Sequence, residues 1–137
     1  MVRTILSSAL ALSLAFNLSA CSSSDDGASG SAPVVSAFTL DPTEVEANKG
    51  ATLDGTVTFE DADGDLASTE GEIRSGGKKA GTIPAQSLSS FKGKTEAEMP
   101  FKLTMPGLPA GEYEIVVWAV DAAGHTSEEK AVTLTAK

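Results

Sequence analysis

A length of 137 residues allows one domain. The formal charge of −9, from 19 acidic and 10 basic side chains, argues against a nucleic acid as partner and against electrostatic attraction to anionic lipid headgroups. Only one cysteine is present, so no disulfide can form within the chain and the core must stabilise the fold.

The chain begins with a segment that has the pattern of a secretory signal. Arg3 supplies a positive charge, and the stretch 5–16 is apolar apart from small residues and serines. This stretch is too short and wrongly flanked for a membrane-spanning helix. We expect residues 1–20 to be a signal peptide that is removed, which takes Arg3 from the formal −9 and leaves about −10.

The expected signal ends in Leu18-Ser19-Ala20-Cys21. This tetrapeptide resembles the lipobox of bacterial lipoproteins. The resemblance implies that the signal is cut before Cys21 and that Cys21 carries acyl chains, such as palmitate, that attach the protein to a membrane. Each buried CH₂ contributes about 0.8 kcal/mol, so two or three chains anchor firmly. The alternative is ordinary secretory cleavage after Ala20, which leaves Cys21 as a free thiol.

A linker follows Cys21, so that residues 21–33 form the lipidated cysteine and its tether. Residues 22–33 hold no large apolar side chain and are rich in serine and glycine, which predicts a flexible segment. Fully extended, it reaches roughly 40 Å. Ser22 stands where many inner-membrane lipoproteins of Gram-negative bacteria have Asp. By that resemblance, Ser22 favours the outer membrane.

Residues 34–137 show short apolar runs separated by turn residues, which predicts strands. Leu53, Val57 and Phe59 alternate with polar residues and indicate one buried face. Pro84 is expected to end a short strand, whereas Pro100 points to an edge strand or a bulge. The expected strands are 34–40, a short one at Val45, 52–59, 66–75, 80–83, 95–105, 112–121 and 130–135.

The run 112–121 is the longest β-type segment, and its middle is apolar on both faces. This composition is typical of a central strand in a packed sheet. The corner 107–113, which ends in Tyr113, resembles the corner that opens strand F in bacterial immunoglobulin-like and fibronectin-type-III-like domains. The resemblance implies that the hydroxyl of Tyr113 bonds back to the corner backbone and that Tyr113, Ile115, Val117 and Ala119 point into the core.

Two further segments resemble loops of the same families. Residues 121–127 are similar to their F–G turn, and 60–66 to their B–C loop. The implied fold class is all-β, an immunoglobulin-like β-sandwich of seven to eight antiparallel strands over 34–137. The chain has neither a B–F cysteine pair nor a tryptophan on strand C, which excludes the antibody-type branch.

The acidic loop is the first candidate site. Asp61, Asp63 and Asp65 alternate with small residues, and Asp121 opens the F–G turn that shares the same end of such a sandwich. Converging carboxylates suit calcium, so these four residues are candidate calcium ligands. The alternative is a solvated acidic turn that uses Asp and Gly for backbone reasons.

Two aromatic or titratable residues complete the candidates. Trp118 lies on the face of its strand opposite Tyr113. It is either an exposed binding platform for a protein or carbohydrate partner, or a side chain that the segment 86–94 or the linker covers. His125 is the only histidine and is expected to be a surface turn residue.

No Gly-x-Ser-x-Gly motif or metal-ligating cluster of His and Cys is present in the sequence. We therefore expect no enzyme. The predicted function is that of a lipid-anchored protein of the bacterial cell envelope with a non-catalytic binding or structural module. The alternative is an inhibitor or accessory subunit of an envelope enzyme, which a protruding loop over 84–94 would favour.

Overall fold

The computed structural model describes residues 30–137. The expected signal peptide 1–20, the lipidation site Cys21, Ser22 and nearly all of the linker lie outside the described residues. The described chain forms strands and one short 3₁₀ helix, η1. These elements are β1 (Val34–Asp41), β2 (Glu44–Val45), β3 (Ala51–Glu60), β4 (Leu66–Ser75), β5 (Lys78–Ser87), η1 (Ser89–Phe91), β6 (Glu96–Met105), β7 (Gly111–Asp121) and β8 (Lys130–Ala136).

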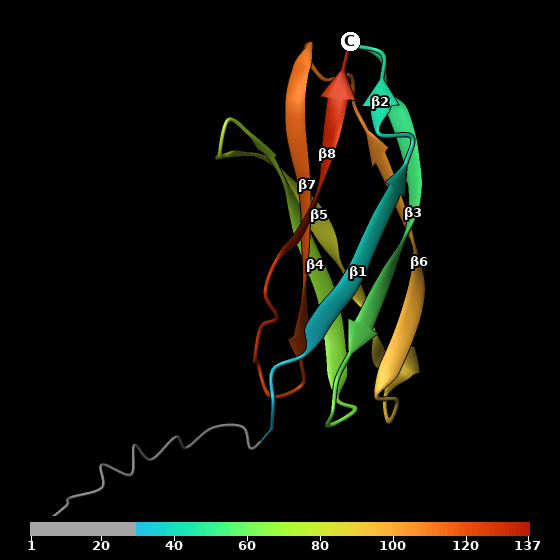
Figure 1. Ribbon diagram of the computed structural model, residues 1–137, viewed down its shortest axis with the longest axis vertical. Coiled ribbons are helices and arrows are strands. Elements are labelled where there is room, and N and C mark those ends of the chain that lie inside the picture. The colour runs from blue at the N-terminus through green and yellow to red at the C-terminus, as the bar shows by residue number, and fades with distance from the viewer. Residues whose placement is uncertain (1–29) are drawn as a thin grey trace, which may run out of the picture.

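Two sheets pack face to face as an elongated sandwich (Figure 1). One sheet has three strands in the order β1-β3-β6, and the other has five in the order β2-β8-β7-β4-β5. All strand pairs are antiparallel except the two-residue β2, which pairs with β8 in parallel. The predicted fold class, an immunoglobulin-like β-sandwich, is confirmed.

Strand β7 lies between β8 and β4, which confirms its predicted central position. Its inward side chains are all buried, and Ile115, Val117 and Ala119 have no exposed surface. The hydroxyl of Tyr113 donates a hydrogen bond of 2.9 Å to the carbonyl oxygen of Pro109. The expected tyrosine corner is thus present, and it fixes the point where the chain enters the central strand.

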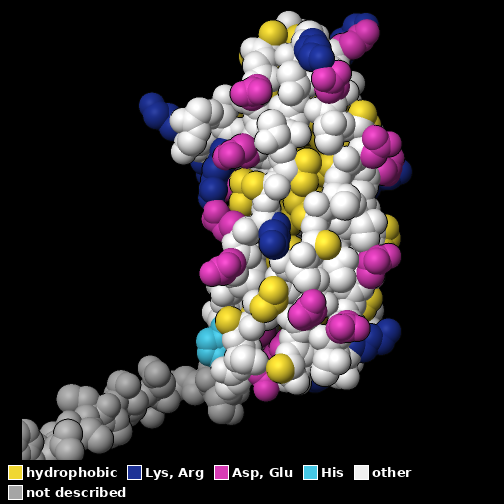
Figure 2. All heavy atoms as spheres, in the orientation of Figure 1, with side chains coloured by type: hydrophobic (Ala, Val, Ile, Leu, Met, Phe, Trp, Pro, Cys, Tyr) yellow, Lys and Arg dark blue, Asp and Glu magenta, His cyan; other side chains and the backbone are white. Residues whose placement is uncertain are grey.

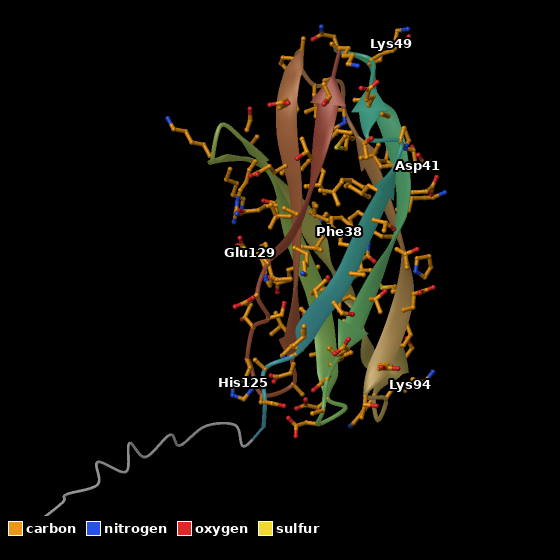
Figure 3. All side chains as sticks on the ribbon, in the orientation of Figure 1. Phe38, Asp41, Lys49, Lys94, His125 and Glu129 are labelled. Atoms are coloured by element: carbon orange, nitrogen blue, oxygen red, sulfur yellow. The ribbon has the colours of Figure 1, made fainter. Side chains whose placement is uncertain are left out.

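Strand β6 alternates strictly between buried and exposed residues. It is an edge strand, and Pro100 lies opposite Thr56 of β3, as predicted. The inner faces of the two sheets meet in one apolar core, where Phe38 and Phe101 stack edge to face with ring centroids 5.3 Å apart. Phe38 points between the sheets in Figure 3.

The expected end of a strand at Pro84 is wrong, because β5 runs from Lys78 to Ser87. β5 is the other edge of the five-stranded sheet, and its register with β4 shifts between Thr69 and Gly71. A proline without an N–H is tolerated at an edge or a bulge. The same physical rule that placed Pro100 correctly therefore also applies to Pro84.

The segment 86–94 is more ordered than its polar sequence indicates. The side chain of Leu88 has no exposed surface, and its N–H donates a 2.8 Å hydrogen bond to the carbonyl oxygen of Ala67. Phe91 is half-buried against the core. The segment closes one end of the sandwich instead of protruding from it.

Candidate functional site

The acidic loop is built on Asp61, which directly follows β3 and is only 2% exposed. Its Oδ1 accepts a hydrogen bond from the N–H of Asp63 at 3.2 Å, and its Oδ2 accepts one from the N–H of Asp65 at 2.9 Å. Aspartate commonly bonds to the backbone two residues on, which folds a tight turn. The Asp61 side chain therefore holds the loop in a shape that turns the next two acidic residues back towards it.

One carboxylate oxygen from each of Asp61, Asp63 and Asp65 lies within 4.8 Å of the other two. Among the residues that the structure describes, Asp65 Oδ1 is buried and has no hydrogen-bond partner. Burial raises the pKa of the Asp65 carboxyl, and the negative charges of Asp121, Asp61 and Asp63 raise this pKa further. Three crowded carboxylates, one of which has a buried oxygen without a hydrogen-bond partner in the described chain, can hold a metal ion.

The β7–β8 turn lies beside this loop, since the N–H of Ala122 donates a 2.8 Å hydrogen bond to the carbonyl oxygen of Asp65. The two loops thus share one end of the sandwich, as expected. Figure 2 shows the single histidine at this end, near acidic side chains, and Figure 3 labels it as His125.

Asp121, the fourth expected ligand, is 3% exposed and bonds to His125. Its Oδ1 accepts the backbone N–H of His125 at 2.7 Å, and its Oδ2 lies 2.7 Å from the ring Nδ1. Burial acts to raise the pKa of Asp121, but the hydrogen bonds from His125 and the backbone of Ala123 outweigh it and lower that pKa. Asp121 therefore organises its own turn, and the group of converging carboxylates consists of the other three aspartates.

The first described residues also reach the acidic loop. Both the N–H and the hydroxyl of Ser31 donate to Asp63 Oδ2, at 2.6 Å and 2.9 Å. The point where the chain enters the sandwich is therefore tied to the loop of converging carboxylates.

Trp118 is half-buried on the outer face of β7. It borders a shallow hollow of about 270 Å³ whose other walls come from β4 and β5. No residue of 86–94 lines this hollow, so the structure supplies neither a fully exposed platform nor the expected cover from that segment. The hollow is lined by Glu70, Gly71, Lys79, Thr82, Ile83, Ala85 and Trp118.

A charged cluster on the same outer face was not anticipated from the sequence. Arg74 Nη1 and Nη2 donate to the two carboxylate oxygens of Glu129 at 2.8 Å and 2.7 Å, and Arg74 Nε pairs with Glu72. The hydrogen bonds from Arg74 lower the pKa of Glu129. The charged residues that alternate along 70–74 were the sign of this cluster in the sequence. Their partner Glu129 comes from the β7–β8 connection, which is distant in the sequence.

No protein-family model matches the chain, and no curated protein matches it. The chain is similar in structure to the PKD domain of an M14-like peptidase from Thermoplasmatales archaeon SCGC AB-540-F20. That likeness has 18% sequence identity and a TM-score of 0.53, and it covers 79% of this chain and 98% of that one.

A second similar structure is Spo0M, a sporulation control protein from Bacillus subtilis. Here the identity is 15% and the TM-score 0.55, over 78% of this chain but only 50% of Spo0M. Fibronectin(III)-like modules of CbhA from Clostridium thermocellum match at 19% identity and a TM-score of 0.46, over 77% of this chain and 47% of that one. The likeness to the PKD domain and to Spo0M shows the fold, a two-sheet sandwich of immunoglobulin type.

Within residues 30–137, no helix has the length and apolar character needed to cross a membrane.

Proposed function

We propose that this protein is a lipid-anchored component of the bacterial cell envelope and that its sandwich is a non-catalytic binding or structural module. One observation carries the proposal. Leu18-Ser19-Ala20-Cys21 ends a signal-like segment, and a Ser/Gly-rich stretch leads from it to the folded domain. Acyl chains on Cys21 attach the protein to the membrane, and Ser22 directs it to the outer membrane if the bacterium is Gram-negative.

The geometry of the domain is consistent with such an anchor. The described chain starts at one end of the elongated sandwich, and the C-terminus lies at the opposite end (Figure 1). A tether at the first end leaves the broad outer faces of both sheets accessible to a partner. The one histidine bonds to Asp121 within its own turn, which suits a structural role.

Detergent phase separation tests the anchor. The wild-type protein is expected in the detergent phase, whereas Cys21→Ser is expected as uncleaved precursor or in the aqueous phase. Ser23→Ala is the matched control and should partition as the wild type does. Equal partitioning of Cys21→Ser and the wild type would remove the lipobox from the proposal.

We also propose that calcium occupies the loop of Asp61, Asp63 and Asp65. The supporting observation is the buried, unpartnered Oδ1 of Asp65 among converging carboxylates. Calcium takes six to eight oxygen ligands, so backbone carbonyls and water would complete the set. When bound, the ion supplies positive charge that offsets the repulsion among the three side chains.

The alternative role as an inhibitor or accessory subunit of an envelope enzyme has weaker support. An inhibitor was expected to carry a protruding loop over 84–94, but Leu88 of that segment is buried in the core. The PKD domain with a similar fold belongs to a peptidase, which suits an accessory role. The binding module remains the leading proposal because the outer face of the five-stranded sheet has a hollow beside Trp118.

A further inference from the structure

The outer face of the five-stranded sheet has an apolar stripe. Strands with one face in water usually have polar residues on that face. Val116, Trp118 and Val120 are the outward residues of β7, and all three are buried or half-buried. Val116 is only 1% exposed, and its neighbour across the sheet is Glu72, which pairs with Arg74. Charged side chains thus border the stripe at Val116. At Trp118 the stripe borders the hollow between β4, β5 and β7.

The hollow beside Trp118 is lined by an aromatic ring and by polar side chains of both charges. One wall is the indole of Trp118, and the others offer one carboxylate, one ammonium and one hydroxyl, from Glu70, Lys79 and Thr82. Glu70 lies directly opposite Trp118 in the sheet. The Lys79 side chain is 56% exposed, and its Nζ lies 3.7 Å from Glu72. An indole surrounded by a few polar groups is typical of a small-ligand surface.

We propose that this hollow binds a neutral carbohydrate, with one sugar ring stacked on Trp118. The proposal rests on the proposed function as a binding module and gives that module a class of ligand. The C–H groups on a sugar-ring face carry slight positive charge and pack on the negative face of an aromatic ring. The hydroxyls around the ring both donate and accept, and so can satisfy Glu70, Lys79 and Thr82 together.

Other ligand classes match the same surface less well. An anion would meet Glu70 and a cation would meet Lys79, so the local charges favour a ligand without net charge. An entirely apolar peptide side chain would cover the polar groups of Glu70 and Thr82 without offering them a hydrogen bond. The volume of about 270 Å³ is below the roughly 300–1,000 Å³ of pockets that enclose drug-sized ligands. The hollow therefore suits a single ring, with the rest of an oligosaccharide lying along the open sheet.

The chain holds one tryptophan, so intrinsic fluorescence reports this site directly. The full mature chain, in a detergent without sugar headgroups, is titrated with cellohexaose, chitohexaose and maltohexaose. At least one of them is expected to shift or quench the emission in a saturable way. Calorimetry should then show binding weakened about tenfold or more in Trp118→Ala and several-fold in Glu70→Gln. Glu112→Gln, on the same sheet but outside the hollow, should bind as the wild type does.

Two results would overturn the proposal. Emission unchanged by all three oligosaccharides at about 10 mM would eliminate the carbohydrate ligand, since stacking on Trp118 must alter its surroundings. Equal affinity of the wild type and a folded Trp118→Ala would place the ligand elsewhere. Circular dichroism of each variant checks the fold. Partitioning of the same preparation into detergent reports the anchor separately, so failure of the sugar titration is distinguishable from failure of the lipid anchor.

Discussion

Calcium should stabilise the domain, and Asp65→Asn should reduce that response. In the absence of calcium, burial and three neighbouring carboxylates raise the pKa of Asp65, so its ionised form is disfavoured in the folded state. Asn removes this charge and should raise the melting temperature of the calcium-free protein at pH 7. The same substitution replaces a charged ligand by a neutral and weaker one. It should therefore raise the melting temperature of the calcium-free protein and reduce the stabilisation by calcium.

The expected size of the calcium effect follows from mass action. Extracellular-type sites have dissociation constants of about 10⁻⁴–10⁻³ M, and the few protein oxygens that converge here place this loop in that weak class. About 5 mM calcium then stabilises the folded state by roughly 1–2 kcal/mol. For a domain of about 100 residues, each kcal/mol raises the melting temperature by roughly 4–8 °C.

The pH dependence of the stability of the calcium-free protein is a second test of the same site. Because the pKa of Asp65 is higher in the folded state than its ordinary 3.8, the folded state binds this proton more readily than the unfolded state. The contribution of Asp65 to stability therefore rises as the pH falls from its raised pKa towards 3.8. Calcium and protons compete for the same carboxylates, so the calcium shift should shrink over that range.

Melting curves by circular dichroism in chelator, calcium, magnesium and a sodium chloride control of matched ionic strength test these expectations. Calcium should raise the melting temperature of the wild type well beyond magnesium or salt, and Asp63→Asn should reduce the shift as Asp65→Asn does. Asp54→Asn, an exposed aspartate on β3 away from the loop, should keep it. A wild-type curve that calcium moves no further than matched salt would refute the metal site.

Three other predictions concern the fold. Val117→Ala should destabilise the domain by about 2–3 kcal/mol in urea melts, because Val117 has no exposed surface, whereas Lys130→Ala should change little; similar losses would show that the faces of β7 are assigned wrongly. Tyr113→Phe should cost about 1 kcal/mol by deleting the bond to the corner carbonyl, and an unchanged midpoint would argue against the corner's role. Gly55→Ala should destabilise by roughly 1–3 kcal/mol because its Cβ would overlap a β1 carbonyl oxygen, but Gly81→Ala, with 3.5 Å to its nearest neighbour, should be tolerated; equal effects would contradict the close approach of β1.

The fold was predictable because local pattern and tertiary environment agree over most strands. The alternation around Leu53, Val57 and Phe59 persists as a buried face, and the apolar run of β7 sits centrally as its composition indicates. The sequence around Pro84 predicts a strand that is too short, because an edge strand with a shifted register accepts a proline. A proline in a strand-like run is compatible with a strand end, an edge strand or a bulge, and only the order of the strands in the sheet decides between them.

The candidate site was predictable only in part. The spacing of Asp61, Asp63 and Asp65 indicated converging carboxylates, and the structure brings them within 4.8 Å. The role of Asp121 could not be predicted from the sequence, because its carboxylate bonds to His125 and this bond competes with binding of a metal ion. Likewise, the bond from Ser31 to Asp63 and the hollow beside Trp118 join residues far apart in sequence, so neither follows from spacing along the chain.

Mass spectrometry of the mature N-terminus is the most direct test of the central claim, a domain anchored by lipid at Cys21. The protein is purified from its native membrane and digested, and its first peptide is sequenced. We expect a peptide that starts at Cys21 and carries acyl chains on that residue. A mature peptide with an unmodified Cys21, or a chain that retains residues 1–20 in the membrane fraction, would contradict it.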